Sequence, residues 1–154
     1  MTKQKKLIKR MSILFVLLIM FVTILSATTA SAFVKPFELD IPANGDLCRT
    51  SNRYLRDTST IQDAWEIKFV YSDEDPSVKT KTTFWLGIYN PNGINPLGSQ
   101  KQIVLEDSGW HYYSAYAAAS KKEVYLYASD NNLKNKLYSV SGKWAPYSGH
   151  RPEN

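Results

Sequence analysis

The feature that most constrains the fold of this chain is a repeated alternation of apolar and polar residues in short segments. Such alternation is typical of β-strands with one buried face, because successive side chains of a strand point to opposite sides. Six or seven segments show it, separated by clusters of Pro, Gly, Asn and Asp: residues 37–41, 65–71, 79–90, 100–105, 110–116, 124–128 and 138–144. No segment has a convincing 3.6-residue period of an amphipathic helix, so we predict an all-β fold.

Two other segments are less regular. Residues 49–63 are mostly polar and are expected to hold one irregular edge strand. Residues 115–119 suit a strand that runs into a turn, although their alanines would also fit a helix. Short strands that recur about every 8 to 12 residues indicate an antiparallel sandwich or barrel. We predict an antiparallel β-sandwich of about six or seven short strands, because strands with one apolar face bury that face against a second sheet.

The first 32 residues have the organisation of a secretory signal peptide. Five basic residues precede an uncharged, mostly apolar run from Met11 to Leu25, and residues 30–32, Ala-Ser-Ala, match the small-x-small cleavage rule. We expect cleavage between Ala32 and Phe33 and secretion of the remainder. An uncleaved anchor is the alternative, because the uncharged stretch 11–34 is long enough to cross a bilayer. The predicted domains are a signal peptide at 1–32, a β-sandwich at 33–145 and a loose C-terminal tail at 146–154.

The formal net charge of +5 belongs to the predicted signal peptide. That segment holds 5 of the 19 basic residues and none of the acidic ones, which leaves 14 of each sign in residues 33–154. Binding to nucleic acid depends strongly on cationic charge, so a neutral mature chain argues against a nucleic-acid partner. Contact with a membrane is expected only through the signal peptide, and the oligomeric state is left open.

Residues for enzymatic or metal chemistry are sparse. The chain has no Gly-x-Ser-x-Gly motif, and its only histidines are His111 and His150, so a serine triad is not indicated. The single cysteine, Cys48, cannot form a disulfide within the chain, and a Cys48–His111 nucleophile pair is left as the catalytic alternative. The run 73–75, Asp-Glu-Asp, lacks the pattern of a calcium loop and is expected to be a solvated hairpin tip. We therefore predict no metal, no cofactor and no enzymatic activity.

Aromatic residues are the one compositional excess, with 18 in residues 33–154. Alternation places four of them opposite the apolar rows of their strands: Trp85, Tyr89, Tyr125 and Tyr127. Rings exposed on a sheet can stack on sugars or enter a membrane interface, so these four are the candidate ligand-binding residues. The alternative is that they form cross-strand pairs that stabilise the sheet and cover its second face.

Several short motifs, taken in order, resemble a family of small exported bacterial proteins of uncharacterised function: Phe37-Glu38-Leu39-Asp40-Ile41-Pro42, Arg53-Tyr54, Ala64-Trp65-Glu66-Ile67, Thr83-Phe84-Trp85-Leu86, Tyr113-Ser114-Ala115-Tyr116, Asp130-Asn131-Asn132 and Tyr138-Ser139-Val140-Ser141-Gly142-Lys143-Trp144. The second half of the chain is also similar, more weakly, to the lactococcin-type secreted bacteriocins. Those are small β-sandwiches that act at the cell envelope. The two resemblances imply export and a β-sandwich, and neither supplies catalytic residues.

From these observations we expect a secreted, non-enzymatic β-sandwich that binds at a bacterial cell surface, with a bacteriocin-like antagonist as one form of that function. The expected partner is a component of the cell envelope or a wall polymer, and the protein would be extracellular or associated with the cell surface. A secreted carbohydrate-binding or cell-wall-binding module is the second hypothesis. A secreted enzyme that depends on Cys48 is the third.

Overall fold

The computed structural model describes residues 33–58, 62–132 and 136–153. The predicted signal peptide, with Ala32 at its end, lies outside the described residues, so its cleavage stays a prediction. Within the described ranges no helix combines the length and apolar character needed to cross a membrane.

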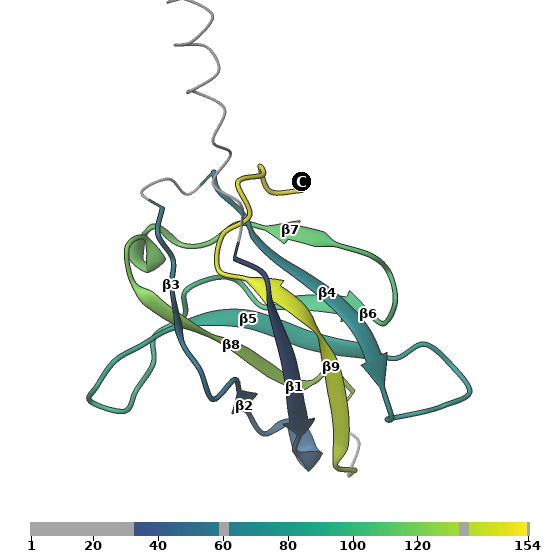
Figure 1. The fold of residues 1–154 in the computed structure, drawn as a ribbon. Helices are drawn as coiled ribbons and strands as arrows, with labels where there is room; N and C mark the ends of the chain where they lie inside the picture. Colours follow the sequence, from purple (N-terminus) through teal and green to yellow (C-terminus); the bar gives the residue numbers. More distant parts are fainter. Residues whose placement is uncertain (1–32, 59–61, 133–135, 154) are drawn as a thin grey trace, which may run out of the picture. The chain divides into compact units, whose positions relative to one another are not determined.

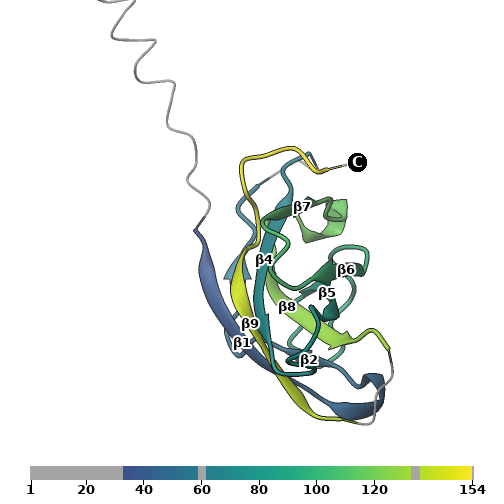
Figure 2. The same cartoon turned by 90° about the vertical axis from the view of Figure 1, so that its right-hand side faces the viewer.

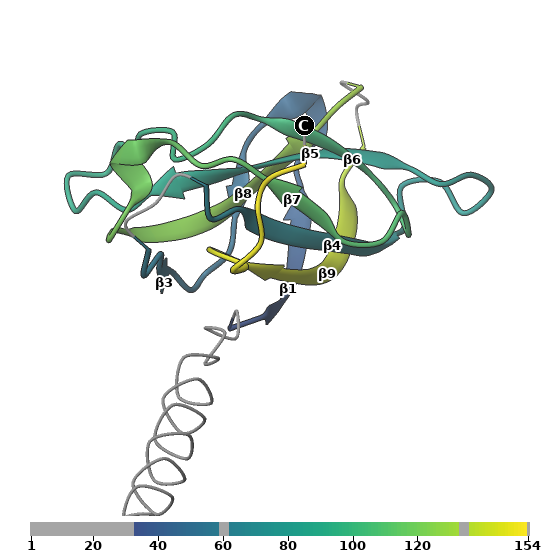
Figure 3. The same ribbon diagram turned by 90° about the horizontal axis from the view of Figure 1, so that it is seen from above.

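Two antiparallel sheets pack against each other as a β-sandwich, which confirms the predicted fold class (Figures 1 and 2). The first sheet has the strand order β1 (Lys35–Ile41), β9 (Tyr138–Ala145), β4 (Trp65–Ser72) and β7 (His111–Tyr113). The second has the order β2 (Cys48–Arg49), β8 (Glu123–Asp130), β5 (Lys81–Ile88) and β6 (Gln102–Leu105), and β3 (Tyr54–Leu55) also pairs with β8. Figure 3 shows the two layers from above, with long loops leaving opposite ends of the sandwich.

All seven predicted strand segments contain a strand of the structure, and the irregular segment holds two very short ones, β2 and β3. Residues 115–119 pass from an isolated bridge at Ala115 into a short 3-10 turn, η2 (Ala117–Ala119). A second 3-10 turn, η1 (Ala43–Gly45), follows β1.

The inward rows of the two sheets form one core. Phe84 of β5 lies between Phe37 of β1 and Phe69 of β4, with ring centroids 5.6 and 5.5 Å away in edge contacts. Edge geometry places the positive rim of one ring on the negative face of the next, which adds to the gain from burial. Trp65 and Trp144 are fully buried in the same core. The core residues that the structure describes run from Phe37 to Ala145, so the unit from residue 33 onwards has a hydrophobic core of its own.

Two details of β4 differ from the alternation. Alternation along residues 65–71 places Tyr71 on the same face as the buried Trp65 and Phe69, but its side chain is 54% exposed. The register between β4 and β9 shifts between Phe69 and Tyr71, and such a bulge moves the residues after it to the other face. The same alternation places Glu66 on the solvent face, but it is buried.

The C-terminal segment lies beside Glu66, because His150 packs against Tyr112, the register partner of Glu66, with ring centroids 5.0 Å apart. The expectation of a loose tail does not hold for residues 146–153, because backbone hydrogen bonds tie them to the start of β4 and to β7. Ala64 N donates to His150 O at 2.9 Å, and Ser148 N donates to Ala64 O at 2.8 Å. The buried guanidinium of Arg56 also donates to Pro146 O. The tail therefore belongs to the folded unit and covers part of the outer face of the first sheet.

Candidate functional site

The four predicted ligand-binding residues lie together on the outer face of the second sheet. β5 and β8 are neighbours in that sheet (Figure 1), and their register pairs Trp85 with Tyr127 and Gly87 with Tyr125. Because Phe84, Leu86 and Ile88 point into the core, the residues between them point outwards. Alternation in the sequence thus assigned these side chains to the correct face.

The four rings form a continuous row. Trp85 and Tyr127 are stacked, with centroids 5.5 Å apart and planes 20° apart. Tyr127 meets Tyr125 edge-on at 6.3 Å, and Tyr125 meets Tyr89 edge-on at 6.0 Å. We call Trp85, Tyr127, Tyr125 and Tyr89 the ring row.

Three cations lie over the ring row, and sequence reasoning did not identify any of them. Lys101 Nζ is 4.6 Å from the centroid of Trp85. The guanidinium carbons of Arg49 and Arg53 are each 4.0 Å from a ring centroid, that of Tyr125 and that of Tyr89 respectively. Attraction between a cation and the negative face of a ring contributes about 0.5–1 kcal/mol at an exposed site. We call the ring row together with Arg49, Arg53 and Lys101 the ring–cation face.

The rings are less exposed than the sequence suggested. Trp85 is 3% exposed and Tyr125 is 5% exposed, while Tyr89 and Tyr127 are half-buried. Neighbouring rings and the three cationic side chains cover their faces. A sugar could not stack on Trp85 or Tyr125 in this arrangement, so the chemistry offered to a ligand is that of the cations.

The electrostatics of the ring–cation face centre on Tyr125. Arg53 Nε donates to a carboxylate oxygen of Glu123 at 2.6 Å, and this hydrogen bond raises the pKa of Arg53. Burial alone would raise the pKa of Tyr125, but interactions of its hydroxyl with Arg49 and Arg53 outweigh burial and lower that pKa. Two guanidinium groups therefore converge on one hydroxyl. Among the described residues, neither Arg49 nor Lys101 has a carboxylate partner within 4.0 Å.

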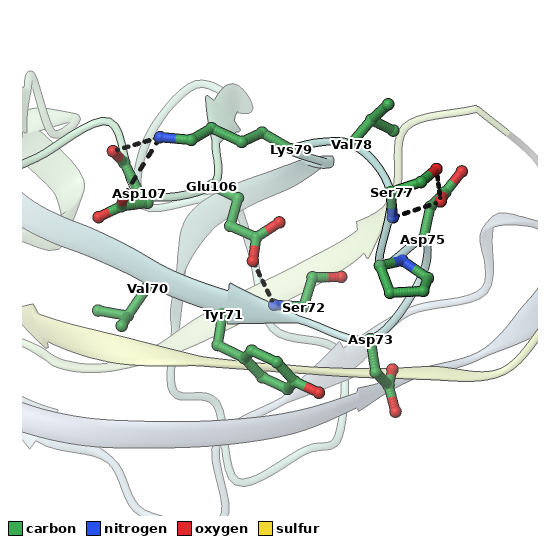
Figure 4. Close-up of a pocket in the computed structure, with 11 residues that line it drawn as sticks. Val70, Tyr71, Ser72, Asp73, Asp75, Ser77, Val78, Lys79, Glu106 and Asp107 are labelled. Carbon is green, nitrogen blue, oxygen red and sulfur yellow. Dashed lines mark hydrogen bonds and ion pairs between the residues drawn. The ribbon is translucent and has the colours of Figure 1, made fainter.

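A hollow of about 560 Å³ beside the turn between β4 and β5 is a second candidate (Figure 4). Its carboxylates already bind protein donors. Glu106 accepts hydrogen bonds from the backbone N–H groups of Ser72 at 3.0 Å and Thr80 at 3.1 Å. Asp107 pairs with Lys79 at 3.2 Å. These bonds fix the turn against the end of β6, and no group of three His, Cys, Asp or Glu suited to a metal occurs in the described part of the chain.

The same turn contains the Asp-Glu-Asp run, and it is not wholly solvated. Glu74 is only 5% exposed, and the amide of Asn132 donates to its carboxylate at 2.8 Å. Lys136 Nζ donates to the backbone oxygen of Glu74 at 2.7 Å. Glu74 thus fastens this turn to the segment between β8 and β9.

A Ser–His–Glu arrangement near β7 was not expected from the sequence. Ser108 Oγ lies 2.7 Å from His111 Nε2, and Glu153 lies 3.8 Å from His111 Nδ1. Ser108 Oγ is also 2.5 Å from the carbonyl oxygen of Leu105, which can only accept a hydrogen bond. Ser108 therefore donates its proton to Leu105 and accepts from His111 Nε2–H. A serine nucleophile needs the opposite direction, with histidine taking the serine proton.

Cys48 is not activated and not paired with a histidine. Its Sγ donates to Ala128 O at 3.5 Å, and burial raises the pKa of the thiol from 9.0 to about 11. Nucleophilic cysteines have a lowered pKa instead. The suggested Cys48–His111 pair does not form, because β2 and β7 are in different sheets and lie at opposite edges of the sandwich (Figure 1).

Comparison of the chain with protein-family models, with curated proteins and with solved structures found no match. Export and a role at the cell envelope, which the resemblances to exported bacterial proteins and to lactococcin-type bacteriocins imply, therefore stay expectations.

Proposed function

We propose that this chain is an exported, non-enzymatic β-sandwich that acts at a bacterial cell surface, where its ring–cation face binds a phosphate-bearing component of the envelope. The observation that carries the proposal is the set of three cations held over aromatic rings on one face of one sheet. Export is the expectation from the first 32 residues, and the envelope as the target is the expectation from the two resemblances.

Phosphate suits this face because of the geometry of arginine. A guanidinium offers paired N–H donors that match two oxygens of a phosphate, and such charged hydrogen bonds are stronger than neutral ones. Arg49 and Lys101 have no carboxylate partner among the described residues, so an anion would not have to displace one there. The ring beneath each cation restricts its side chain before binding, which reduces the conformational entropy lost on binding.

The test is co-sedimentation of the chain that begins at Phe33 with purified bacterial cell walls. Three surfaces separate the possible sources of phosphate. They are intact walls, walls stripped of phosphodiester polymers with cold hydrofluoric acid, and vesicles of phosphatidylcholine with phosphatidylglycerol. We expect binding to intact walls, loss of binding to stripped walls, and weaker binding as salt is added, because ions screen exposed charges.

A pair of double variants tests the ring–cation face itself. Arg49→Gln with Lys101→Gln removes two cations from the face and should weaken binding to walls by about tenfold or more, the factor that corresponds to 1.4 kcal/mol. Lys143→Gln with Arg151→Gln removes the same charge from exposed residues elsewhere and should bind like the unmodified chain. Equal binding by both double variants, equal binding to stripped walls, or no binding to walls would each refute the proposal.

Growth of related bacterial strains is scored in a separate incubation of live cells with the unmodified chain and with the two double variants. The bacteriocin-like form of the function would be supported if the unmodified chain inhibits growth and the Arg49→Gln/Lys101→Gln variant does not. Binding without inhibition would support a protein that only attaches to the wall.

A further inference from the structure

A second hollow opens at the edge of the sandwich, and its lining includes no residue of the ring–cation face. It has a volume of about 430 Å³ and lies where β6 and β7, the last strands of their sheets, come to the same side of the molecule (Figures 1 and 2). Six side chains line it: Gln100, Gln102, Tyr113, Ser114, Tyr116 and Glu153. We call it the edge hollow.

The edge hollow has a fixed frame. Ser99 and Ala115 form an isolated antiparallel bridge, and Tyr116 N donates to Gly98 O at 2.7 Å, so the segments on either side are joined beside the hollow. Glu153 is held because its N–H donates to Tyr112 O at 2.8 Å. The lining residues therefore come from backbone that is already hydrogen-bonded, and a ligand would meet a site that is largely preformed.

Most polar side-chain groups in the edge hollow have no hydrogen-bond partner in the part of the chain that the structure describes. The side-chain amides of Gln100 and Gln102 and the hydroxyls of Tyr113, Ser114 and Tyr116 make no hydrogen bond to any described residue. Amides and hydroxyls both donate and accept. Five such groups around one hollow form a surface for a ligand that itself both donates and accepts at several positions.

The aromatic and charged groups of the lining further restrict the chemical class of ligand that the edge hollow can bind. The ring of Tyr113 stacks parallel to His111, with centroids 5.9 Å apart and planes 7° apart, and Tyr116 adds a second ring to the lining. Tyrosine rings, which have an apolar body and a polar hydroxyl, suit ligands that carry both apolar and polar groups. Among the described residues that line the hollow, the carboxylate of Glu153 is the one charged group, and it would repel an anion.

We propose that the edge hollow binds a neutral saccharide unit. A pyranose ring offers hydroxyls that donate and accept around its rim and C–H groups on its faces, which match the amides, hydroxyls and tyrosine rings of this site. The inference goes beyond the binding of phosphate at the ring–cation face, because it concerns another surface, other residues and an uncharged ligand.

The test is an NMR titration of the 15N-labelled chain that begins at Phe33, with the side-chain amide signals of glutamine as the readout. The probes are chitotetraose and maltotetraose, which are neutral, and trigalacturonic acid, which is anionic. We expect at least one neutral probe to shift the amide signals of Gln100 and Gln102 at concentrations up to about 10 mM, the range of a weak single-sugar contact. The amide of Gln62, outside the hollow, is the internal control and should not move.

Substitution at two exposed lining residues separates binding from folding. Gln100→Ala with Ser114→Ala should reduce the affinity for the active probe at least tenfold, while Gln62→Ala with Ser51→Ala should leave it unchanged. The proposal is overturned if neither neutral probe shifts Gln100 and Gln102, if the acidic probe binds equally well, or if the shifts fall on the ring row. Since no wall or phosphate enters this titration, its outcome is independent of the proposed envelope binding.

Discussion

The ring of Tyr127 on β8 lies directly against the backbone of Gly87 on β5. A methyl group at position 87 would come within 2.7 Å of Tyr127 Cδ2, closer than carbon atoms approach in proteins. The missing side chain lets Tyr127 lean across the sheet and stack on Trp85. The continuity of the ring row therefore depends on a glycine near the C-terminal end of β5.

Replacing Gly87 with alanine should displace the Tyr127 ring and separate it from Trp85. We expect Gly87→Ala to destabilise the fold by about 1–3 kcal/mol, the usual cost of overpacking. We also expect it to change the near-UV circular dichroism of tryptophan. Tyr127→Ala in the same chain removes the clash, so a double-mutant cycle measured by urea unfolding should show strong coupling. Additive effects of the two substitutions would contradict the contact.

Gly142 of β9, the one glycine in the described strands of the first sheet, should not tolerate a side chain. A Cβ atom there would overlap the backbone oxygen of Lys68 and come within 2.8 Å of Phe37 Cε1. A backbone atom in a paired strand cannot move aside as a side chain can. We expect Gly142→Ala to destabilise the protein by about 3 kcal/mol or more, at the upper end for overpacking.

The neighbouring substitution Ser141→Ala is the matched control for Gly142→Ala. Ser141 lies in the same strand, and its loss should change the free energy of unfolding by no more than about 0.5 kcal/mol. Both are measured by thermal and urea unfolding. Equal stability of the two variants would show that β9 can shift away from β4.

Glu66 should make the protein less stable at neutral pH than in mild acid. Burial under the C-terminal segment raises the pKa of Glu66 from its ordinary 4.5, so the folded state holds this proton more tightly than the unfolded state. The stabilising contribution is complete below pH 4.5 and is lost as the pH rises through the raised value. Glu66→Gln should therefore raise the melting temperature at pH 7, and this gain should shrink towards pH 4.5.

Glu38→Gln, at an exposed position of β1, controls for the loss of one carboxylate. Melting curves of the three proteins across this pH range provide the comparison. A gain that is the same at every pH would show that the burial of Glu66 has no linkage to protonation.

The thiol of Cys48 should react slowly while the protein is folded. Its pKa of about 11, against 9.0 for an unburied thiol, lowers the fraction of reactive thiolate about 100-fold at pH 8. Alkylation with iodoacetamide, followed by mass spectrometry, should be slower by at least that factor than for the same chain in urea. Rapid alkylation of the folded chain would reopen the hypothesis of a Cys48-dependent enzyme.

Local alternation predicted the strands well because each strand carries its own period. Phe84, Leu86 and Ile88 of β5 are buried, as their spacing requires, and Trp85 and Tyr89 are on the opposite face. The same reasoning failed at Tyr71, where a bulge interrupts the period, and at Glu66, where a distant segment covers the outer face. Both failures come from contacts that no local pattern contains.

The sequence predicted only some of the residues that form the candidate sites. The four rings of the ring row were predicted from β5 and β8, but the cations over them come from elsewhere: Arg49 from β2, Arg53 from just before β3, and Lys101 from just before β6. The edge hollow had no sequence signal at all, because it exists only where the edges of two sheets meet.

The sequence by itself determined the all-β class, the positions of the strands and the face on which the four rings of the ring row lie, since these depend on the two-residue period within a strand. Only the tertiary structure decided which strands are neighbours and which distant side chains cover or frame them. Arg49 and Lys101 reach the same ring row because β2, β8, β5 and β6 are ordered side by side, although 51 positions separate the two residues. Strand order depends on the packing of the whole core, which involves contacts between residues far apart in the sequence. No single segment therefore determines it.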